Sequence, residues 1–205
     1  MKKTAIAVFV SGGGTNLQAL IDAAAAGKLP SGEIKLVLAS NPKAYALERA
    51  KKANIETAVV TPKEPDAEEK IQSILAANGI QMIVLAGYMS ILSESFTKRW
   101  ENRILNVHPS LIPAFCGKGF YGLRVHEAAL ARGVKVTGAT VHFVNEIPDG
   151  GEILLQKAVE ILPGDTPETL QKRVMEQAEW KLLPAAAELV ANKLMNEENC
   201  YVENE

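Results

Sequence analysis

The sequence predicts an α/β fold in which a doubly wound, mostly parallel sheet is covered by helices on both faces. Apolar, β-branched runs recur along the first half of the chain, and stretches with helical periodicity separate them. Strands that alternate with helices form parallel sheets whose two faces are both buried. The ligand crevice of such a sheet lies at the carboxyl ends of the strands, near the point where the strand order reverses.

The elements of the first half follow from these patterns. Five strands are expected, at Thr4–Val10, Glu33–Ala39, Thr57–Val60, Met82–Ala86 and Ile104–Val107. Good helix formers recur at the helical period between the first four strands, at Asn16–Ala26, Ala44–Ala53 and Asp66–Ala77.

The second half of the chain has a different pattern of predicted elements. A Pro/Gly-rich stretch at 109–122 precedes a short predicted helix at Val125–Ala131 and two predicted strands, at Thr140–Val144 and Ile153–Ile161. A turn-forming Pro-Asp-Gly-Gly segment separates these strands, so we expect them to pair antiparallel. A long C-terminal helix is expected at Thr166–Met195, where Pro184 should kink or split it. The polar tail at 196–205 should fray.

Size and composition favour one soluble domain. The 205 residues fit a single domain, which spans roughly 100–200 residues. The net charge of -2 provides no global field for nucleic acid or an anionic membrane. Cys116 and Cys200 form no disulfide framework, and the short apolar run before Ser11 is too brief for a signal peptide. We therefore expect a cytoplasmic protein, and both a monomer and a homodimer remain open.

The loop from Ser11 to Asn16 joins the first strand to the first helix and contains three consecutive glycines. Glycines let backbone amides point at an anion, and the start of a helix adds a favourable dipole. The loop lacks both the dinucleotide-binding pattern and the Gly-Lys-Ser/Thr ending of a P-loop. It therefore indicates a single phosphate on a smaller ligand, or else an ordinary strand-to-helix turn.

Asn106 and His108 carry the strongest chemical signal. They stand two apart at the end of a strand, so their side chains share one face and can converge on one carbonyl. An amide can donate to a developing oxyanion, and an imidazole can supply a proton or a positive charge. Ser110 follows closely, but it lacks the turn of a nucleophilic serine and is given little weight.

Asp149 is the expected partner of His108. Because it follows a proline and precedes two glycines, the backbone can carry its carboxylate deep into a crevice. A nearby carboxylate raises the pKa of an imidazole, which would keep His108 protonated near neutral pH. Taken alone, the same four residues would be read as a simple turn.

The remaining histidines and the cysteine receive structural interpretations. A surface or packing role is expected for His126, and a buried, hydrogen-bonded role for His142. The spacing of the three histidines is not that of a zinc site, so no metal is expected. Cys116 is interpreted as an incidental or structural thiol.

The motifs taken together resemble the folate-dependent formyltransferases. The resemblance runs from about Lys2 to Ala191. It rests on Ser11–Asn16, Leu85–Leu92, Asn106–Pro113 and the segment from His142 to Gly151, which occur in the family's order and spacing. The chain is most similar to the branch that formylates glycinamide ribonucleotide in purine biosynthesis, and a Rossmann-like formyltransferase fold is implied.

The resemblance assigns roles to particular residues. Asn106, His108 and Asp149 match the family's catalytic trio, and a phosphate-binding half at about 1–100 precedes a folate-binding and catalytic half at about 101–195. Contacts to glycinamide ribonucleotide fall on Gly14, Thr15, Asn16 and Glu179. Contacts to 10-formyltetrahydrofolate, the implied co-substrate, fall on Lys63, Met89, Ser90, Ile91, Leu92, Asn106, Asn145, Glu146, Ile147, Pro148 and Asp149.

Three departures from the family pattern accompany these assignments. Many relatives have Arg at the position of Ser90, and the Ala114–Leu123 segment is longer than in some relatives. The residues around Glu179 align only with a one-residue shift. Three rival functions share parts of the pattern. A methionyl-tRNA formyltransferase would add a basic tRNA-binding domain, a formyltetrahydrofolate hydrolase would add an N-terminal regulatory domain, and a nucleotide-binding module would bind ligands without turnover.

Overall fold

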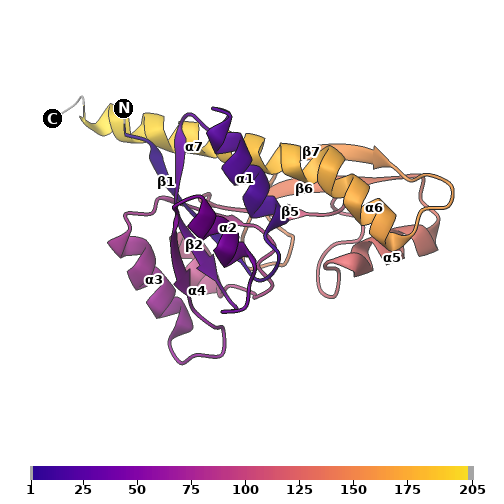
Figure 1. The fold of residues 1–205 in the computed structure, drawn as a ribbon, viewed down its shortest axis with the longest axis horizontal. Coiled ribbons are helices and arrows are strands. Elements are labelled where there is room, and N and C mark those ends of the chain that lie inside the picture. Colours follow the sequence, from indigo (N-terminus) through magenta and orange to yellow (C-terminus); the bar gives the residue numbers. More distant parts are fainter. Residues whose placement is uncertain (1, 203–205) are drawn as a thin grey trace.

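Seven strands form one sheet in a computed structural model that describes residues 2–202 (Figure 1). The strand order is β3-β2-β1-β4-β5-β6-β7. The strands are β1 (Thr4–Val10), β2 (Gly32–Ala39), β3 (Glu56–Val59), β4 (Met82–Leu85), β5 (Ile104–His108), β6 (Val136–Phe143) and β7 (Ile153–Glu160). Strands β1 to β5 pair parallel, whereas β6 pairs antiparallel with both β5 and β7. The predicted fold class is confirmed.

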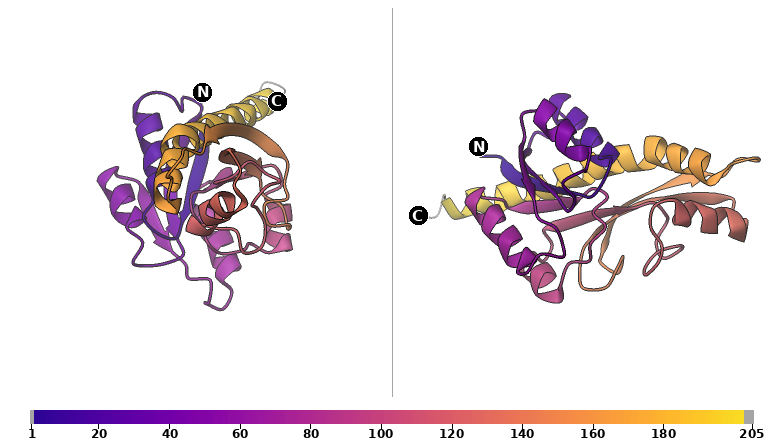
Figure 2. Two further views of the ribbon diagram at one scale, coloured as in Figure 1. Left: turned by 90° about the vertical axis from the view of Figure 1, so that its right-hand side faces the viewer. Right: turned by 60° about the horizontal axis from the view of Figure 1, so that its bottom comes forward.

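Helices cover both faces of the sheet. They are α1 (Thr15–Ala25), α2 (Ala46–Lys52), α3 (Ala67–Ala77), α4 (Glu94–Arg99), α5 (Leu123–Arg132), α6 (Pro167–Val174) and α7 (Trp180–Val202), and the π-helical turn η1 (Met175–Glu179) joins the last two. Figure 2 shows from two further sides how α7 runs along one face of the sheet.

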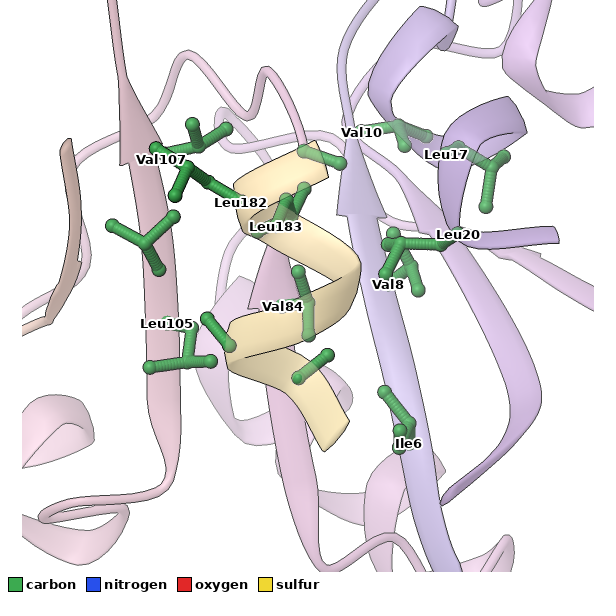
Figure 3. Close-up of a cluster of buried hydrophobic side chains, with 14 of the residues drawn as sticks. Ile6, Val8, Val10, Leu17, Leu20, Val84, Leu105, Val107, Leu182 and Leu183 are labelled. Carbon is green, nitrogen blue, oxygen red and sulfur yellow. The ribbon is translucent and has the colours of Figure 1, made fainter. Parts of the chain in front are cut away.

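The core follows the alternation of side chains along β1. Ile6, Val8 and Val10 point to the face that packs against α1 and α7, whereas Ala7 and Phe9 point to the face beneath α3 and α4. Figure 3 shows Leu182 and Leu183 of α7 beside the labelled side chains of β1, β4 and β5. A fully buried side chain of this kind stabilises the fold by about 1.5–3 kcal/mol.

The sheet has its topological switch point between β1 and β4. From β1 the chain proceeds outward to β2 and β3, then returns to β4 and proceeds outward in the other direction. The loops that leave β1 and β4 therefore diverge and leave a crevice at the carboxyl ends of the strands. The glycine loop after β1, the segment after β4 and the end of β5 all meet there.

The structure corrects two predictions about the C-terminal helix. Pro184 lies inside α7 and does not split it, because neighbouring residues such as Leu183 and Ala187 are fully buried and hold the helix on the sheet. The irregularity lies earlier, at η1, where bonds from residue i to i+5 replace the α-helical pattern. The helix also continues beyond Met195 to Val202, so most of the tail expected to fray is helical. Positions 203–205 lie outside the described residues.

The sequence also missed α4. It has six residues, too few for a clear periodic pattern, and Ser93 begins it by accepting a hydrogen bond from Phe96 N at 3.2 Å. None of the helices among residues 2–202 is long and apolar enough to cross a membrane.

Candidate active site

The end of β5 and the loop after β6 bring three polar side chains together. Asn106 and His108 lie on one face of β5, as their spacing predicts, and Asp149 reaches them from a left-handed backbone conformation with φ 56°. Asp is one of the residues that tolerates this conformation. His108 Nδ1 lies 3.4 Å from Asp149 Oδ2. The structure thus unites the three residues that the sequence singled out.

His142 completes the cluster. It is the cross-strand partner of Asn106, whose Nδ2 donates to His142 Nε2 at 3.2 Å. The Nδ1–H of His142 donates to the carbonyl of Phe143 at 2.8 Å, and Nε2 lies 3.5 Å from Asp149 Oδ1. The predicted buried, hydrogen-bonded role is therefore correct, but His142 also links two members of the trio. Only the register between β5 and β6 reveals this, and no sequence pattern encodes that register.

The Pro/Gly-rich segment closes the other side of the cluster through its backbone. His108 Nε2 donates to the carbonyl of Phe115 at 2.9 Å, and Gly117 N donates to Asp149 Oδ2 at 2.8 Å. Backbone groups of the segment therefore hydrogen-bond to Nε2 of His108 and to Oδ2 of Asp149. A substrate that needs either atom has to displace a backbone group of the segment.

Burial shapes the electrostatics of the His108 and Asp149 pair. Desolvation lowers the pKa of His108 below its ordinary value, although the carbonyl of Phe115 and the charge of Asp149 act to raise it. The expectation that Asp149 keeps the imidazole charged near neutral pH is therefore wrong for the free protein, because desolvation outweighs the carboxylate. Burial acts to raise the pKa of Asp149, but the nearby imidazoles of His142 and His108 and the hydrogen bond from Gly117 N outweigh it and hold that pKa low.

The cluster opens into a cleft of about 840 Å³. Asn16, Met89, Ser90, Ile91, Asn106, His108, Asp149 and Glu179 are among its lining residues. A smaller hollow of about 130 Å³ adjoins it and is lined by Leu92, Asn145, Glu146, Ile147, Pro148 and others. Both hollows share Asn106 and Asp149, so a flat ring in the smaller one would lie beside the cluster. Every assigned folate residue except Lys63 lines one of them.

Lys63 lies apart from the other assigned residues. It is exposed in the loop between β3 and α3 and lines neither hollow. No local sequence pattern indicates this separation, and only the folded chain shows it.

The glycine loop holds its shape by close packing. Gly14 has φ 72°, and a Cβ there would lie 2.6 Å from the side chain of Ala46, so a larger residue would clash. Of the three residues assigned to phosphate contact, Asn16 lines the main cleft, whereas Thr15 borders a separate hollow of about 650 Å³ between α1 and α7.

Glu179 reaches the cleft from the π-helical turn. Its carboxylate accepts a hydrogen bond from Asn16 Nδ2 at 2.7 Å, and burial raises its pKa to about 7. A π turn contains one more residue than an α-helical turn. One extra residue in the turn is consistent in number with the one-residue shift at this position.

Three other residues have roles that the structure clarifies. The buried hydroxyl of Ser110 donates to the carbonyl of Ala114 and is not free to act as a nucleophile. His126 is fully buried, and burial lowers its pKa to about 4. Burial and Asp149 raise the pKa of the Cys116 thiol, which makes it less reactive.

Among residues 2–202, no group of three or more acidic, histidine or cysteine side chains could hold a metal ion.

Comparison with known proteins identifies the family. The profile of the formyl transferase family matches residues 4–187. The chain belongs to the formyl transferase family. Phosphoribosylglycinamide formyltransferase of Haemophilus influenzae is 43% identical over 188 residues, which are 90% of this chain and 84% of that protein. The resemblance noted in the sequence is therefore confirmed for the family.

One further relative is similar to this chain in sequence, and one solved structure is similar to it in fold. The trifunctional purine biosynthetic protein adenosine-3 of Homo sapiens is 41% identical over 212 residues, covering 100% of this chain and 20% of that protein. The chain thus spans about a fifth of the length of that relative. The crystal structure of phosphoribosylglycinamide formyltransferase from Brucella melitensis superposes with a TM-score of 0.84 at 42% identity, covering 93% of this chain and 96% of that one.

Proposed function

We propose that this chain transfers the formyl group of 10-formyltetrahydrofolate to the amine of N1-(5-phospho-D-ribosyl)glycinamide, in the synthesis of purine nucleotides. The observation that carries the proposal is the convergence of Asn106, His108 and Asp149 at the junction of two adjoining hollows. The smaller hollow suits part of a pterin, since apolar side chains such as Ile91 and Leu92 and polar ones such as Asn106 both line it. The larger one has room for a sugar phosphate between the trio and Glu179.

Asn106 and His108 stabilise the negative charge that develops during transfer. The substrate amine attacks the formyl carbon, and the carbonyl oxygen becomes an oxyanion that needs donors about 3 Å away. The Nδ2 of Asn106 carries two hydrogens, of which one already binds His142, so the other is available. His108 supplies the second donor once the carbonyl of Phe115 releases Nε2.

Asp149 controls the charge of His108 during this step. Only the doubly protonated imidazole can donate to acceptors at both ring nitrogens. Desolvation disfavours this cation in the free protein, but the oxyanion adds a second negative charge beside it. The carboxylate and the oxyanion together favour the imidazolium at the moment when it is needed.

Proton balance completes the reaction. A new carbon–nitrogen bond forms to the substrate amine, and the bond from the formyl carbon to the folate nitrogen breaks. One proton leaves the amine and one reaches the folate nitrogen, and Asp149 is placed to position a water that relays it. The route needs no metal, because N–H donors stabilise the oxyanion.

The glycine loop and Glu179 hold the acceptor substrate. Backbone amides after β1 and the start of α1 favour the phosphate, and Asn16 and Glu179 border the main cleft on the same side. In this proposal, the phosphate and the reacting amine lie at opposite ends of the substrate. We also propose that the chain forms a single domain and that the protein is located in the cytoplasm.

Product formation from both substrates tests the proposal directly. The protein is incubated with 10-formyltetrahydrofolate and the ribonucleotide, and formylated product and tetrahydrofolate are quantified. A parallel reaction without the ribonucleotide separates a transferase from a hydrolase. Release of tetrahydrofolate at the same rate in both reactions would refute the transferase assignment.

The variant His108→Ala tests the role of the trio. The loss of one oxyanion donor typically lowers kcat by about 100- to 1,000-fold, so we expect at least a 100-fold fall with the fold intact. His126→Ala is the matched control, because it removes another buried imidazole that does not line the cleft. Activity of His108→Ala within a few-fold of the parent would contradict the proposed mechanism.

A further inference from the structure

The hydroxyl of Ser11 connects three loops at the switch point of the sheet. Ser11 follows β1, Ser40 follows β2 and Met89 follows β4, and these strands are neighbours. Ser11 Oγ accepts a hydrogen bond from Met89 N at 2.9 Å and lies 2.6 Å from Ser40 Oγ. The mechanism above does not use this hydroxyl.

The segment after β4 is anchored by side chains on either side of Met89 and Ile91: Tyr88 packs on Phe9 with ring centroids 5.3 Å apart, and Leu92 is buried. Between β4 and α4 the chain has no regular secondary structure, and the side chains of Met89 and Ile91 are 57% and 81% exposed. Its backbone amides are held at Ala86, which donates to Phe9 O at 2.9 Å, and at Ser93, which donates to Glu68 Oε1 at 2.7 Å. The bond to Ser11 attaches the backbone amide of Met89, in the middle of the segment, to the loop after β1.

The glycine loop, by contrast, is fastened independently of Ser11. Gly12 O accepts from Ala46 N at 3.1 Å, and Gly13 O accepts from Arg49 Nε at 2.8 Å. Both bonds connect the loop to α2. Removing the Ser11 hydroxyl therefore leaves the glycine loop in place and frees the backbone amide of Met89.

We propose that Ser11 is a positioning residue that fixes the backbone at Met89 against the glycine loop, and so sets the geometry of the folate site without contacting the folate. This inference rests on the proposed function, because it assumes that the segment after β4 meets the folate. It predicts an asymmetric effect: the loss of the hydroxyl weakens folate binding and leaves binding of the ribonucleotide nearly unchanged.

The test compares Ser11→Ala with Ser40→Ala. The net contribution of one hydrogen bond corresponds to about a 2- to 10-fold change in an equilibrium constant. Calorimetry should show that Ser11→Ala weakens binding of tetrahydrofolate by about 5-fold, while the KM for the ribonucleotide changes less than about 2-fold. Ser40→Ala keeps the bond from Met89 N to Ser11 and should bind tetrahydrofolate like the parent.

Hydrogen exchange at the Met89 amide gives a readout that requires no ligand. Exchange should be faster in Ser11→Ala than in the parent and unchanged in Ser40→Ala. Ser11→Cys, which keeps the shape but replaces the oxygen by a weak acceptor, serves if the alanine variant does not fold. Equal losses of affinity for both substrates, or faster Met89 exchange with unchanged folate affinity, would overturn the inference. A parent protein that binds no tetrahydrofolate would instead refute the proposed function.

Discussion

Replacing Glu179 by Gln should remove a pH dependence from the stability of the protein. Glu179 is 6% exposed, and burial raises the pKa of its carboxyl group from 4.5 to about 7, although the hydrogen bond from Asn16 acts to lower it. A carboxyl group with a higher pKa in the folded state binds its proton more tightly when the chain is folded. The free energy of unfolding is therefore highest below pH 4.5 and falls as the pH rises towards the folded pKa of about 7.

The size of the effect follows from the two pKa values. Each pKa unit corresponds to about 1.4 kcal/mol, so the change from 4.5 to about 7 corresponds to about 3 kcal/mol. At a pH where Glu179 is protonated in both the folded and the unfolded chain, the parent loses no stability from this residue. Once the folded protein has also lost the proton, its free energy of unfolding is lower by the full amount. The glutamine introduced by Glu179→Gln would mimic the protonated acid, because its amide oxygen can still accept from Asn16 and it does not titrate.

Urea denaturation from about pH 4 to about pH 8.5, a range that brackets both pKa values, measures the difference. The free energy of unfolding of Glu179→Gln minus that of the parent should rise by about 3 kcal/mol between acid and alkaline pH. Glu176→Gln removes an exposed carboxylate from the same helical turn and controls for the loss of a charge. Parallel pH profiles for Glu179→Gln and the parent would show that folding does not raise the pKa of Glu179, and the reasoning from burial would be wrong.

Three further variants test the surroundings of the trio. Thr140→Val removes a buried hydroxyl that makes three hydrogen bonds to neighbouring residues. Urea denaturation should show that this lowers the free energy of unfolding by about 3 kcal/mol. A change below about 0.5 kcal/mol would contradict this. Gly151→Ala should lower the Tm, since its Cβ would lie 1.8 Å from the carbonyl oxygen of Phe143. Asp149→Asn should lower the pKa of His108 further, because the carboxylate acts to raise it, and an unmoved limb of the pH–rate profile would argue against that coupling.

Local sequence patterns predicted most of the fold because the physics behind them is local. The apolar run at Thr4–Val10 is a strand in the structure as predicted, and it is buried along its whole length. The short helix α4 was missed because it has too few residues to show a period. The last two strands were predicted with boundaries that differ from those of β6 and β7.

The C-terminal helix shows where local preference misleads. Pro184 removes one backbone donor, which argues for a break. Burial of α7 against the sheet outweighs that cost, and the helix continues through the proline. No local pattern in the sequence predicted the π turn that carries Glu179.

The sequence by itself determined the order of the elements, the shared face of Asn106 and His108, and the residue types that make up the trio. Each of these depends on spacing along a short stretch of chain. Only the tertiary structure decided that His142 joins the trio, that Lys63 lies apart from it, and that desolvation outweighs Asp149 in setting the pKa of His108. Those outcomes depend on strand register and on the exclusion of water, which arise when distant segments pack together and which no local pattern encodes.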